Sequence, residues 1–324
     1  MASDALITLD HVAKTFVVRV RAGRLRRTKR VVHAVDDISF AITQGSMIGY
    51  IGPNGAGKST TVKMLIGILT PSAGSVRVAG LDPSRARTDV ARHIGVVFGQ
   101  RTQLWWDLPL RDSFDLLRHV YGVALDRHAE NLTRYIDILD LGAFLDTPVR
   151  QLSLGQRMRG ELAAALLHDP EILFLDEPTI GLDLVSKEAV RTFLRELNDE
   201  RGTTVLLTTH DLVDVERLCD RLLIIDHGHV IEDGSVNDIK ARYGGERTLV
   251  VDLEEPSAPL DIDGAEVVQV DGPRQWLRFR RDGLTAAQLL AVVSSRAAVR
   301  DIAIEDTAIE DVVRRIYDGA DPRQ

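Results

Sequence analysis

The stretch MIGYIGPNGAGKST, residues 47–60, decides the fold of this chain. An apolar run leads directly into Gly52-Pro53-Asn54-Gly55-Ala56-Gly57-Lys58-Ser59-Thr60, which fits the P-loop pattern G-x-x-x-x-G-K-S/T. The glycines allow such a loop to wrap around phosphate groups with its backbone N–H groups pointing inward. We expect Lys58 to neutralise phosphate oxygens and the Ser59 hydroxyl to bind Mg²⁺. The apolar run before the loop and the helical spacing after it, over Thr60–Leu69, distinguish it from a chance glycine-rich turn.

A second motif places two acids at the end of a buried strand. Ile172–Leu175 is apolar and is followed at once by Asp176-Glu177-Pro178. Ligands of open α/β sheets bind at the carboxyl ends of the strands, where Asp176 would stand. Asp176 is expected to hold Mg²⁺ through water, and Glu177 to polarise an attacking water as general base. Two acids after a strand often mark only an exposed turn, but a P-loop upstream favours the catalytic interpretation.

Composition narrows the class of protein. A length of 324 residues is enough for about two domains. The formal net charge of −8 argues against bulk binding to nucleic acid. Cys219 is the only cysteine, which excludes a disulfide framework and a Cys-rich zinc site. The first residues lack the basic and apolar segments of a signal peptide, and no apolar run approaches the ~18 residues of a membrane span. We therefore expect the chain not to cross a membrane.

Strands and helices alternate over the first three quarters of the chain, which predicts a mainly parallel α/β sheet. Helical spacing dominates between residues 110 and 168, with Leu116, Leu117 and Val120 as one apolar stripe, and predicts a separate helical lobe over about residues 100–168. The expected strands of this part are Leu6–Leu9, Thr15–Val20, Ile38–Ile42, Met47–Ile51, Ser75–Val78, Ile94–Phe98, Ile172–Leu175, Thr204–Thr208, Arg221–Asp226 and Val230–Glu232. Two further helices are expected at Leu184–Arg201 and Leu212–Cys219.

The character of the sequence changes after Gly244-Gly245. The pattern predicts a small α+β domain over residues 245–324, separate from the domain over residues 1–244. Its expected elements, in order, are strands at Thr248–Leu253, Glu266–Val270 and Gln275–Arg280, a helix at Thr285–Ser295, a strand at Val299–Ile304 and a helix at Ile309–Tyr317.

A specific resemblance appears when the motifs are taken in order. After the P-loop come LSLGQ at 152–156, LFLDEP at 173–178, TIGLD at 179–183 and TTHD at 208–211. This order resembles the ATPase domain of ABC transporters over about residues 5–243. The family's signature is LSGGQ, so the chain departs from it at Leu154 and keeps Ser153 and Gly155. Ser153 also suits the N-cap of a helix.

The resemblance implies an ATP site with an antiparallel β-subdomain and a helical subdomain around the P-loop core. Residues Gly52–Thr60 would hold the phosphates of ATP, and Phe16 would stack on adenine, although it also suits a plain strand position. His210 matches the switch histidine that contacts the γ-phosphate and Glu177. Gln100 matches the glutamine that senses Mg²⁺ and the transmembrane partner. Here Gly99 separates Gln100 from the aromatic residue that it usually follows.

The same resemblance implies a composite site shared between two protomers. Asp183 matches the loop that crosses the dimer interface, and the signature residues would bind the γ-phosphate of ATP held by the partner; these are Ser153, Gly155 and Gln156. The dimer would be a homodimer or a pair with a paralogous ATPase subunit. It would hydrolyse MgATP and drive a separate integral membrane permease from the cytoplasmic face of the membrane.

Other stretches of the sequence indicate where the chain belongs among ABC proteins and distinguish it from other classes of ABC ATPase. Gly95–Pro109, together with LSLGQRMR, resembles ATPase subunits of two-component bacterial exporters. The alternative is a soluble ABC ATPase that acts on nucleic acid or ribosomes. Ribosome-acting members carry two cassettes in one chain, and chromosome ATPases insert a long coiled coil before the signature; neither feature is present, so we expect no nucleic-acid partner. A binder that no longer hydrolyses ATP is disfavoured by Glu177 and His210.

Two features allow two interpretations each. Arg19–Arg30 is rich in arginine and lysine, which suits a solvated hairpin tip or a contact with anionic lipid, worth ~1 kcal/mol per basic residue. Trp105-Trp106 suits half-buried loop packing or the lining of the groove that receives the membrane subunit, since interfaces are enriched in Trp.

Overall fold

The computed structural model describes residues 5–21, 27–99, 101–280 and 283–319. The chain divides into two compact units, Met1–Gly234 and Ser235–Gln324. The break falls ten residues before the boundary expected at residue 244, because helix α8 (Val236–Tyr243) packs against α10 (Ile309–Tyr317) of the second unit. The extent of the ATPase domain itself stays a prediction.

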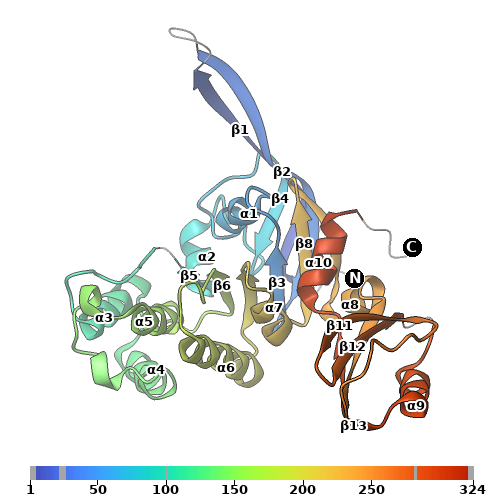
Figure 1. The fold of residues 1–324 in the computed structure, drawn as a ribbon. Helices are drawn as coiled ribbons and strands as arrows, with labels where there is room; N and C mark the ends of the chain where they lie inside the picture. Colours follow the sequence, from blue (N-terminus) through green and yellow to red (C-terminus); the bar gives the residue numbers. More distant parts are fainter. Residues whose placement is uncertain (1–4, 22–26, 100, 281–282, 320–324) are drawn as a thin grey trace. The chain divides into compact units, whose positions relative to one another are not determined.

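The first unit is built around a sheet with the strand order β5-β6-β7-β3-β8-β9 (Figure 1). Strands β5, β6, β7, β3 and β8 pair in parallel, as the alternation of strands and helices predicts. The bounds of the strands are β3 Met47–Ile51, β5 Ile94–Phe98, β6 Ile172–Asp176, β7 Thr204–Thr208, β8 Arg221–Asp226 and β9 His229–Ser235. Strands β3 and β7 are buried throughout.

A smaller antiparallel sheet of order β2-β1-β4 packs on this core. Its strands are β1 Ala5–Arg21, β2 Arg27–Thr43 and β4 Ala73–Val78. Strand β1 pairs with β4 only as far as Ala13, and β1 and β2 continue beyond it as a ribbon that stands out in Figure 1. The two separate N-terminal strands expected from sequence are thus one strand, interrupted by register shifts between Leu9 and Thr15.

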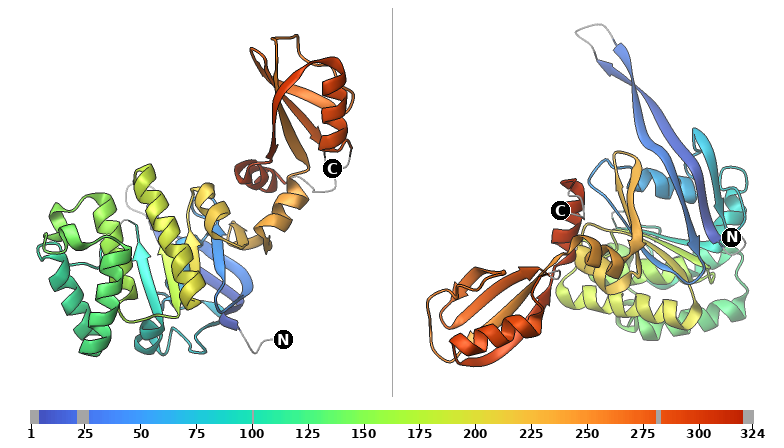
Figure 2. Two further views of the ribbon diagram at one scale, coloured as in Figure 1. Left: turned by 90° about the horizontal axis from the view of Figure 1, so that it is seen from below. Right: turned by 90° about the vertical axis from the view of Figure 1, so that its right-hand side faces the viewer.

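Helices cover the parallel sheet and form a lobe beside it. The bounds are α1 Lys58–Leu65, α2 Arg87–His93, α3 Leu110–Tyr121, α4 Leu125–Ile138, α5 Leu154–Leu166, α6 Leu184–Arg201 and α7 Leu212–Leu218, with short 3₁₀ turns at Gly142–Phe144 and Val149–Gln151. Figure 2 shows α3, α4 and α5 gathered at one side of the first unit. The apolar stripe expected on α3 was partly wrong: Leu117 is buried, but Leu116 and Val120 are 38% and 69% exposed, because Leu110 and Phe114 fill the inward face.

Cys219 ends helix α7 inside the core. Its side chain is buried, and its sulfur lies beside Gly49 of β3, where an added Cβ would come within 3.5 Å of it. Burial raises the pKa of its thiol well above the usual range. The sole cysteine is therefore a core residue.

The second unit is an antiparallel sheet of order β11-β12-β10-β13 with one helix packed on it (Figure 2). Leu249 and Val251 of β10 and Leu277 of β12 form its core together with Leu289 and Val293 of α9. The elements are β10 Glu246–Leu253, β11 Ala265–Asp271, β12 Arg274–Arg280, α9 Ala286–Arg296 and β13 Val299–Asp306, followed by α10. In the described part of the chain, no helix is long and apolar enough to cross a bilayer.

Candidate active site

The P-loop leaves the buried strand β3 and ends at the first residue of α1. Gly57 has φ 109°, a left-handed conformation that L side chains rarely adopt, and an added Cβ would lie 2.5 Å from the Ala34 carbonyl oxygen. The loop is closed by hydrogen bonds from the Ala56 N–H to the Pro53 carbonyl (3.1 Å) and from the Thr61 N–H to the Gly57 carbonyl (2.9 Å). Helix α1 begins at Lys58, two residues earlier than predicted. Its N-terminus therefore lies within the P-loop motif and faces the site of an anion.

A pocket of about 780 Å³ opens in front of the loop. Lys58 lies on its wall and donates to the carbonyl oxygens of Gly52 and Pro53. Burial lowers the pKa of Lys58, while the nearby charges of Glu177 and Asp176 act in the opposite direction. The residues lining the pocket are Ala34, Pro53, Asn54, Gly55, Gly57, Lys58, Ser59, Thr60, Lys63, Ile68, Phe98, Gly99, Arg101, Asp176, Glu177, Ile180 and His210.

The carboxyl ends of three parallel strands bring the acidic residues to the same pocket. Asp176 is the last residue of β6, and Thr208 at the end of β7 donates its hydroxyl to it. The backbone amide of Gly99, after β5, donates to the carbonyl of Asp176 (2.7 Å), and the amide of Glu177 donates to the carbonyl of Thr208 (2.9 Å). The sheet thus brings Asp176 and Glu177 to the pocket that Lys58 lines, close enough for their charges to act on Lys58, at the carboxyl ends of the strands.

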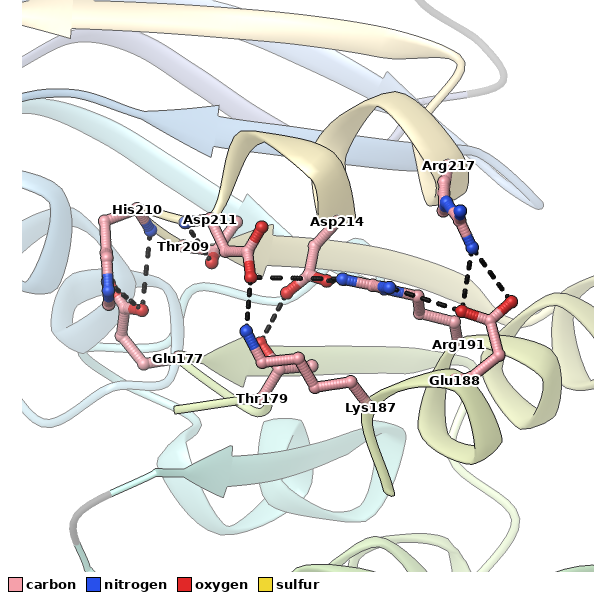
Figure 3. Close-up of polar contacts among 10 residues, drawn as sticks. All are labelled: Glu177, Thr179, Lys187, Glu188, Arg191, Thr209, His210, Asp211, Asp214 and Arg217. Atoms are coloured by element: carbon pink, nitrogen blue, oxygen red, sulfur yellow. Dashed lines mark hydrogen bonds and ion pairs between the residues drawn. The ribbon is translucent and has the colours of Figure 1, made fainter. Parts of the chain in front are cut away.

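Glu177 and His210 face each other across this edge. The Nδ1 of His210 lies 2.6 Å from Oε2 of Glu177, and the His210 backbone amide lies 3.4 Å from the same oxygen (Figure 3). The His210 side chain is 70% exposed, whereas that of Glu177 is 24% exposed. Glu177 has φ 57°, an uncommon conformation for a residue with a side chain that often marks functional sites.

The segment around LSLGQ begins helix α5. Ser153 is its N-cap and forms a capping box with Gln156: the Gln156 amide donates to the Ser153 hydroxyl (3.2 Å), and the Ser153 amide to Gln156 Oε1 (2.9 Å). Leu154 is the first helical residue, so its side chain is tolerated where the family pattern has glycine. It packs against Gly181, where an added Cβ would come within 2.8 Å of Leu154 Cδ2.

Asp183 begins helix α6 beside this segment. It accepts hydrogen bonds from the Ser186 amide (2.8 Å) and hydroxyl (3.0 Å), which lower its pKa. An added Cβ at Gly155 would lie 2.8 Å from the Ser186 hydroxyl oxygen. Ser153 and Asp183 are exposed, and they are absent from the pocket wall formed by the described residues. The first unit therefore carries two separate sets of predicted site residues.

Two further residues predicted for the site are Gln100 and Phe16. Gln100 lies outside the described residues, although its neighbours Gly99 and Arg101 line the pocket. Phe16 is half-buried on β1 opposite Val32, with the Lys14 ammonium 5.2 Å from its ring centroid. It does not belong to the described pocket wall, so its contact with adenine stays a prediction.

Lys63 and Arg101 line the pocket and were missed in the sequence. The signal that could have found them is their positive charge: Lys63 follows shortly after the P-loop, and Arg101 follows directly after Gln100.

Comparison with known proteins is consistent with this geometry. The family model described as ABC transporter matches residues 35–180. The Nod factor export ATP-binding protein I of Sinorhizobium fredii is 34% identical over 89% of this chain and 82% of that protein. The daunorubicin/doxorubicin resistance ATP-binding protein DrrA of Streptomyces peucetius is 39% identical over 76% of this chain and 78% of that protein.

This chain belongs to the ABC transporter ATP-binding proteins.

Solved structures agree with that membership. A structure of an ATP-binding subunit of an ABC transporter superposes with a TM-score of 0.63 at 25% identity, over 74% of this chain and 93% of that chain. The ATP-binding cassette MJ0796, a dimer in a post-hydrolysis state bound to ADP and Pi, superposes with a TM-score of 0.61 at 26% identity, over 71% of this chain and 98% of that chain. The chain is an ATP-binding and ATP-hydrolysing subunit of an ABC transporter, and a soluble ABC ATPase acting on nucleic acid or ribosomes is not favoured.

Proposed function

We propose that the pocket hydrolyses MgATP with Glu177 as general base and His210 as its partner. The observation that carries this proposal is the 2.6 Å approach of His210 Nδ1 to Glu177 Oε2, in the pocket that Lys58 also lines. Lys58 and the backbone amides of the P-loop hold the phosphates. Glu177 accepts the proton of the attacking water, and His210 fixes the carboxylate and reaches the γ-phosphate from its exposed position.

The residues of the pocket fit Mg²⁺. Among the described residues there is no cluster of three or more His, Cys, Asp or Glu that could hold a metal ion by itself. Mg²⁺ needs no such cluster, because it is usually held by one or two protein oxygens with substrate phosphates and waters. The Ser59 hydroxyl and the Asp176 carboxylate line the same pocket and supply such oxygens. Ser59 and Asp176, with Gln100 as a further proposed contact, would hold the ion, and it would supply positive charge to offset that of the phosphates.

The second set of site residues, Ser153, Gly155, Gln156 and Asp183, is called here the partner-facing set, and its surroundings support a composite dimer. Leu184 and Val185 follow Asp183 in the first turn of α6 and are 76% and 79% exposed. Large apolar side chains exposed next to a polar motif are typical of an interaction site. We infer that Ser153, Gly155 and Gln156 bind the ATP of a second protomer, either a copy of this chain or a paralogous subunit, with Asp183 in the interface.

A separate integral membrane permease is the proposed partner that uses this ATP hydrolysis. Trp105 and Trp106 are 39% and 47% exposed after the Gln100 segment, which favours an interface over loop packing, and Val120 and Leu116 add exposed apolar surface to the helical lobe. Relatives named for Nod factor export and for daunorubicin resistance support export as the direction of transport. The protein would act as a peripheral subunit on the cytoplasmic face, where ATP is available.

Two accessory roles belong to the same proposal. On the ribbon, Arg19 lies opposite Lys29 in the pairing register, and like charges placed opposite each other are unfavourable without a counter-charge. Contact of Arg19–Arg30 with anionic lipid headgroups would supply it; residues 22–26 of this segment lie outside the described residues.

The α+β domain over residues 245–324 carries no catalytic motif, and we assign to it regulation or stabilisation of the dimer.

Purification of the tagged full-length chain from detergent-solubilised membranes tests the proposed partnership. We expect an integral membrane protein to co-purify and to change the rate of ATP hydrolysis when the two are reconstituted in vesicles. Recovery with ribosomes or nucleic acid instead, and no membrane protein, would contradict the transport role.

A further inference from the structure

Asp214 is a buried acid that no part of the proposed reaction uses. It lies in the first turn of α7 and is fully buried, with a relative exposure of 0%. Its Oδ2 accepts a hydrogen bond from the Thr179 hydroxyl, and its Oδ1 accepts from Nε of Arg191 at 2.7 Å and also from Nη2 (Figure 3). Thr179 and Arg191 are themselves only 2% and 6% exposed. Both oxygens of the carboxylate are therefore satisfied by donors from other elements.

The partners of Asp214 come from the segments that carry the catalytic groups. Thr179 follows Glu177 by two residues, in the loop between β6 and α6. Asp214 itself follows His210 by four residues, and Arg191 lies on α6, the helix that Asp183 begins. One carboxylate thus joins the Glu177 loop, the His210 loop and the helix of the partner-facing set. Among the described residues, the pocket wall includes none of these three side chains.

A second contact joins the same segments nearer the surface. Lys187 of α6 donates to Oδ2 of Asp211 at 2.6 Å, and Arg191 Nη2 lies 3.9 Å from that oxygen. Burial acts to raise the pKa of Asp211, but the hydrogen bond and charge of Lys187 outweigh it, and the pKa is lowered. The Asp211 amide donates to the Thr209 hydroxyl (3.0 Å), so the residues on both sides of His210 are held.

The chemistry of these contacts restricts movement of the loops. A buried charge without its partner is costly, so Asp214 and Arg191 stay paired while the domain is folded. The Glu177 backbone is in an uncommon conformation, which persists only where the surroundings determine it. The Thr179 hydrogen bond, two residues further on, is such a constraint.

We propose that Asp214, with Arg191 and Thr179, is the positioning centre that holds Glu177 against His210 and ties both to the helix begun by Asp183. The inference rests on the proposed roles of Glu177 and His210. None of the three side chains lines the described wall of the pocket, so they would act through the loops that they fix.

The test removes one hydrogen bond and leaves the charged pair in place. Thr179→Val deletes the hydroxyl that Asp214 accepts from. We expect kcat for ATP hydrolysis to fall by about 10- to 100-fold, the size of effect that a small misplacement of a catalytic group produces. The affinity for ATP should stay unchanged, because the P-loop is not altered. Thr179→Ser keeps the hydroxyl and should restore kcat.

A matched control comes from the same two helices. Arg217 of α7 donates to Glu188 of α6 at 2.8 and 3.0 Å, and both side chains are about half exposed. Glu188 also accepts from Nη1 of Arg191 at 3.3 Å, so the loss of Arg217 removes an exposed neighbour of Arg191 and leaves the bonds of Asp214 to Arg191 and Thr179 in place. Arg217→Gln should leave kcat unchanged. If Thr179→Val behaves like Arg217→Gln, or if its kcat is not restored by Thr179→Ser, the positioning role is wrong. A parallel loss of ATP affinity would mark a merely structural contact and would overturn it too.

Glu177→Gln, assayed alongside, separates this inference from the proposed function. Turnover that survives in Glu177→Gln contradicts the proposed function itself. An inactive Glu177→Gln with a fully active Thr179→Val contradicts only the positioning centre. Asp214→Asn should lose kcat at least as strongly as Thr179→Val; if it does not fold, the Thr179 pair of variants still decides the question.

Discussion

The nucleotide pocket and the partner-facing set of Ser153, Gly155, Gln156 and Asp183 are built in opposite ways. In the pocket, the P-loop, Asp176, Glu177 and His210 face one another, and their polar groups are bonded within the chain. In the partner-facing set, the helix caps are satisfied internally, but Ser153 and Asp183 are exposed next to the bare side chains of Leu184 and Val185. The polar groups of the first region have their partners within the chain, whereas the second region exposes polar and apolar side chains that another protomer could contact. Under the proposed function, a single protomer would hold ATP with the first set and would present the second set to its neighbour.

The largest effect should come from the base inside the pocket. Glu177→Gln keeps the shape of the side chain but cannot accept a proton, so we expect kcat to fall by about 100- to 10,000-fold. ATP binding should persist, because Lys58 and the loop are intact. The variant should accumulate as an ATP-bound dimer, measured by size-exclusion chromatography with light scattering. Turnover at the wild-type rate would remove Glu177 from the mechanism.

Mixed dimers test whether the partner-facing set completes the pocket of another protomer. Homodimers of Lys58→Ala or of Ser153→Arg should each be inactive, because both of their sites contain one defective half. Co-expression of the two variants in equal amounts should leave about a quarter of all sites intact in a two-fold symmetric dimer. Phosphate release should then return in part, unless the two sites must act together. A Ser153→Arg homodimer as active as wild type would reduce Ser153 to a helix cap.

Removal of the second unit should have little effect on ATP hydrolysis, because it alters neither the nucleotide pocket nor the partner-facing set. Neither set of residues includes any residue after Gly234, so a chain ending at Gly234 should hydrolyse ATP at the basal rate of the full chain. A chain ending at Gly244 retains α8 without α10 and should have a lower melting temperature than the chain ending at Gly234. A folded chain 1–234 that binds ATP but does not hydrolyse it would show that the second unit takes part in catalysis.

The smallest effect concerns the helix that Ser153 begins. Glu161 on α5 is buried, and burial raises its pKa, although hydrogen bonds from Thr102 and the Gln103 amide limit the shift. The folded protein therefore binds this proton more tightly than the unfolded chain. The free energy of unfolding should decline as the pH rises from the ordinary carboxyl value of 4.5 towards the higher folded pKa.

Glu161→Gln cannot ionise and should lack this decline. Urea unfolding of both proteins from acid to neutral pH measures the difference. Identical pH profiles would mean that the pKa of Glu161 is the same in the folded and unfolded chain, despite its burial.

Much of the fold could be predicted because its elements are strongly patterned. The bounds of β5, α6, β7, β8 and α10 agree with the predictions to the residue. Strand β1 was predicted in pieces, because its register shifts interrupt the alternation that identifies a strand. Helix α1 was predicted to begin too late, because Gly57 provides no side-chain cap to mark its start.

The motifs located the pocket, but the contacts that orient it could not be predicted. Asp214 is 35 residues from Thr179 and 23 residues from Arg191 along the chain. No local pattern relates such residues, since their pairing depends on how α6 and α7 pack. Leu154 shows the same limit: only the observed helix start explains how a side chain is accepted there.

The position of Cys219 has a practical consequence. A buried thiol with a raised pKa reacts with alkylating reagents only when the core around α7 and β3 opens. The rate at which Cys219 is alkylated therefore measures how often this part of the core unfolds locally. A cysteine introduced on the surface, for example at Val185, would be labelled selectively without any change to the native residue. Spectroscopic probes attached in pairs to two protomers could then report the opening and closing of the dimer during each cycle of ATP hydrolysis.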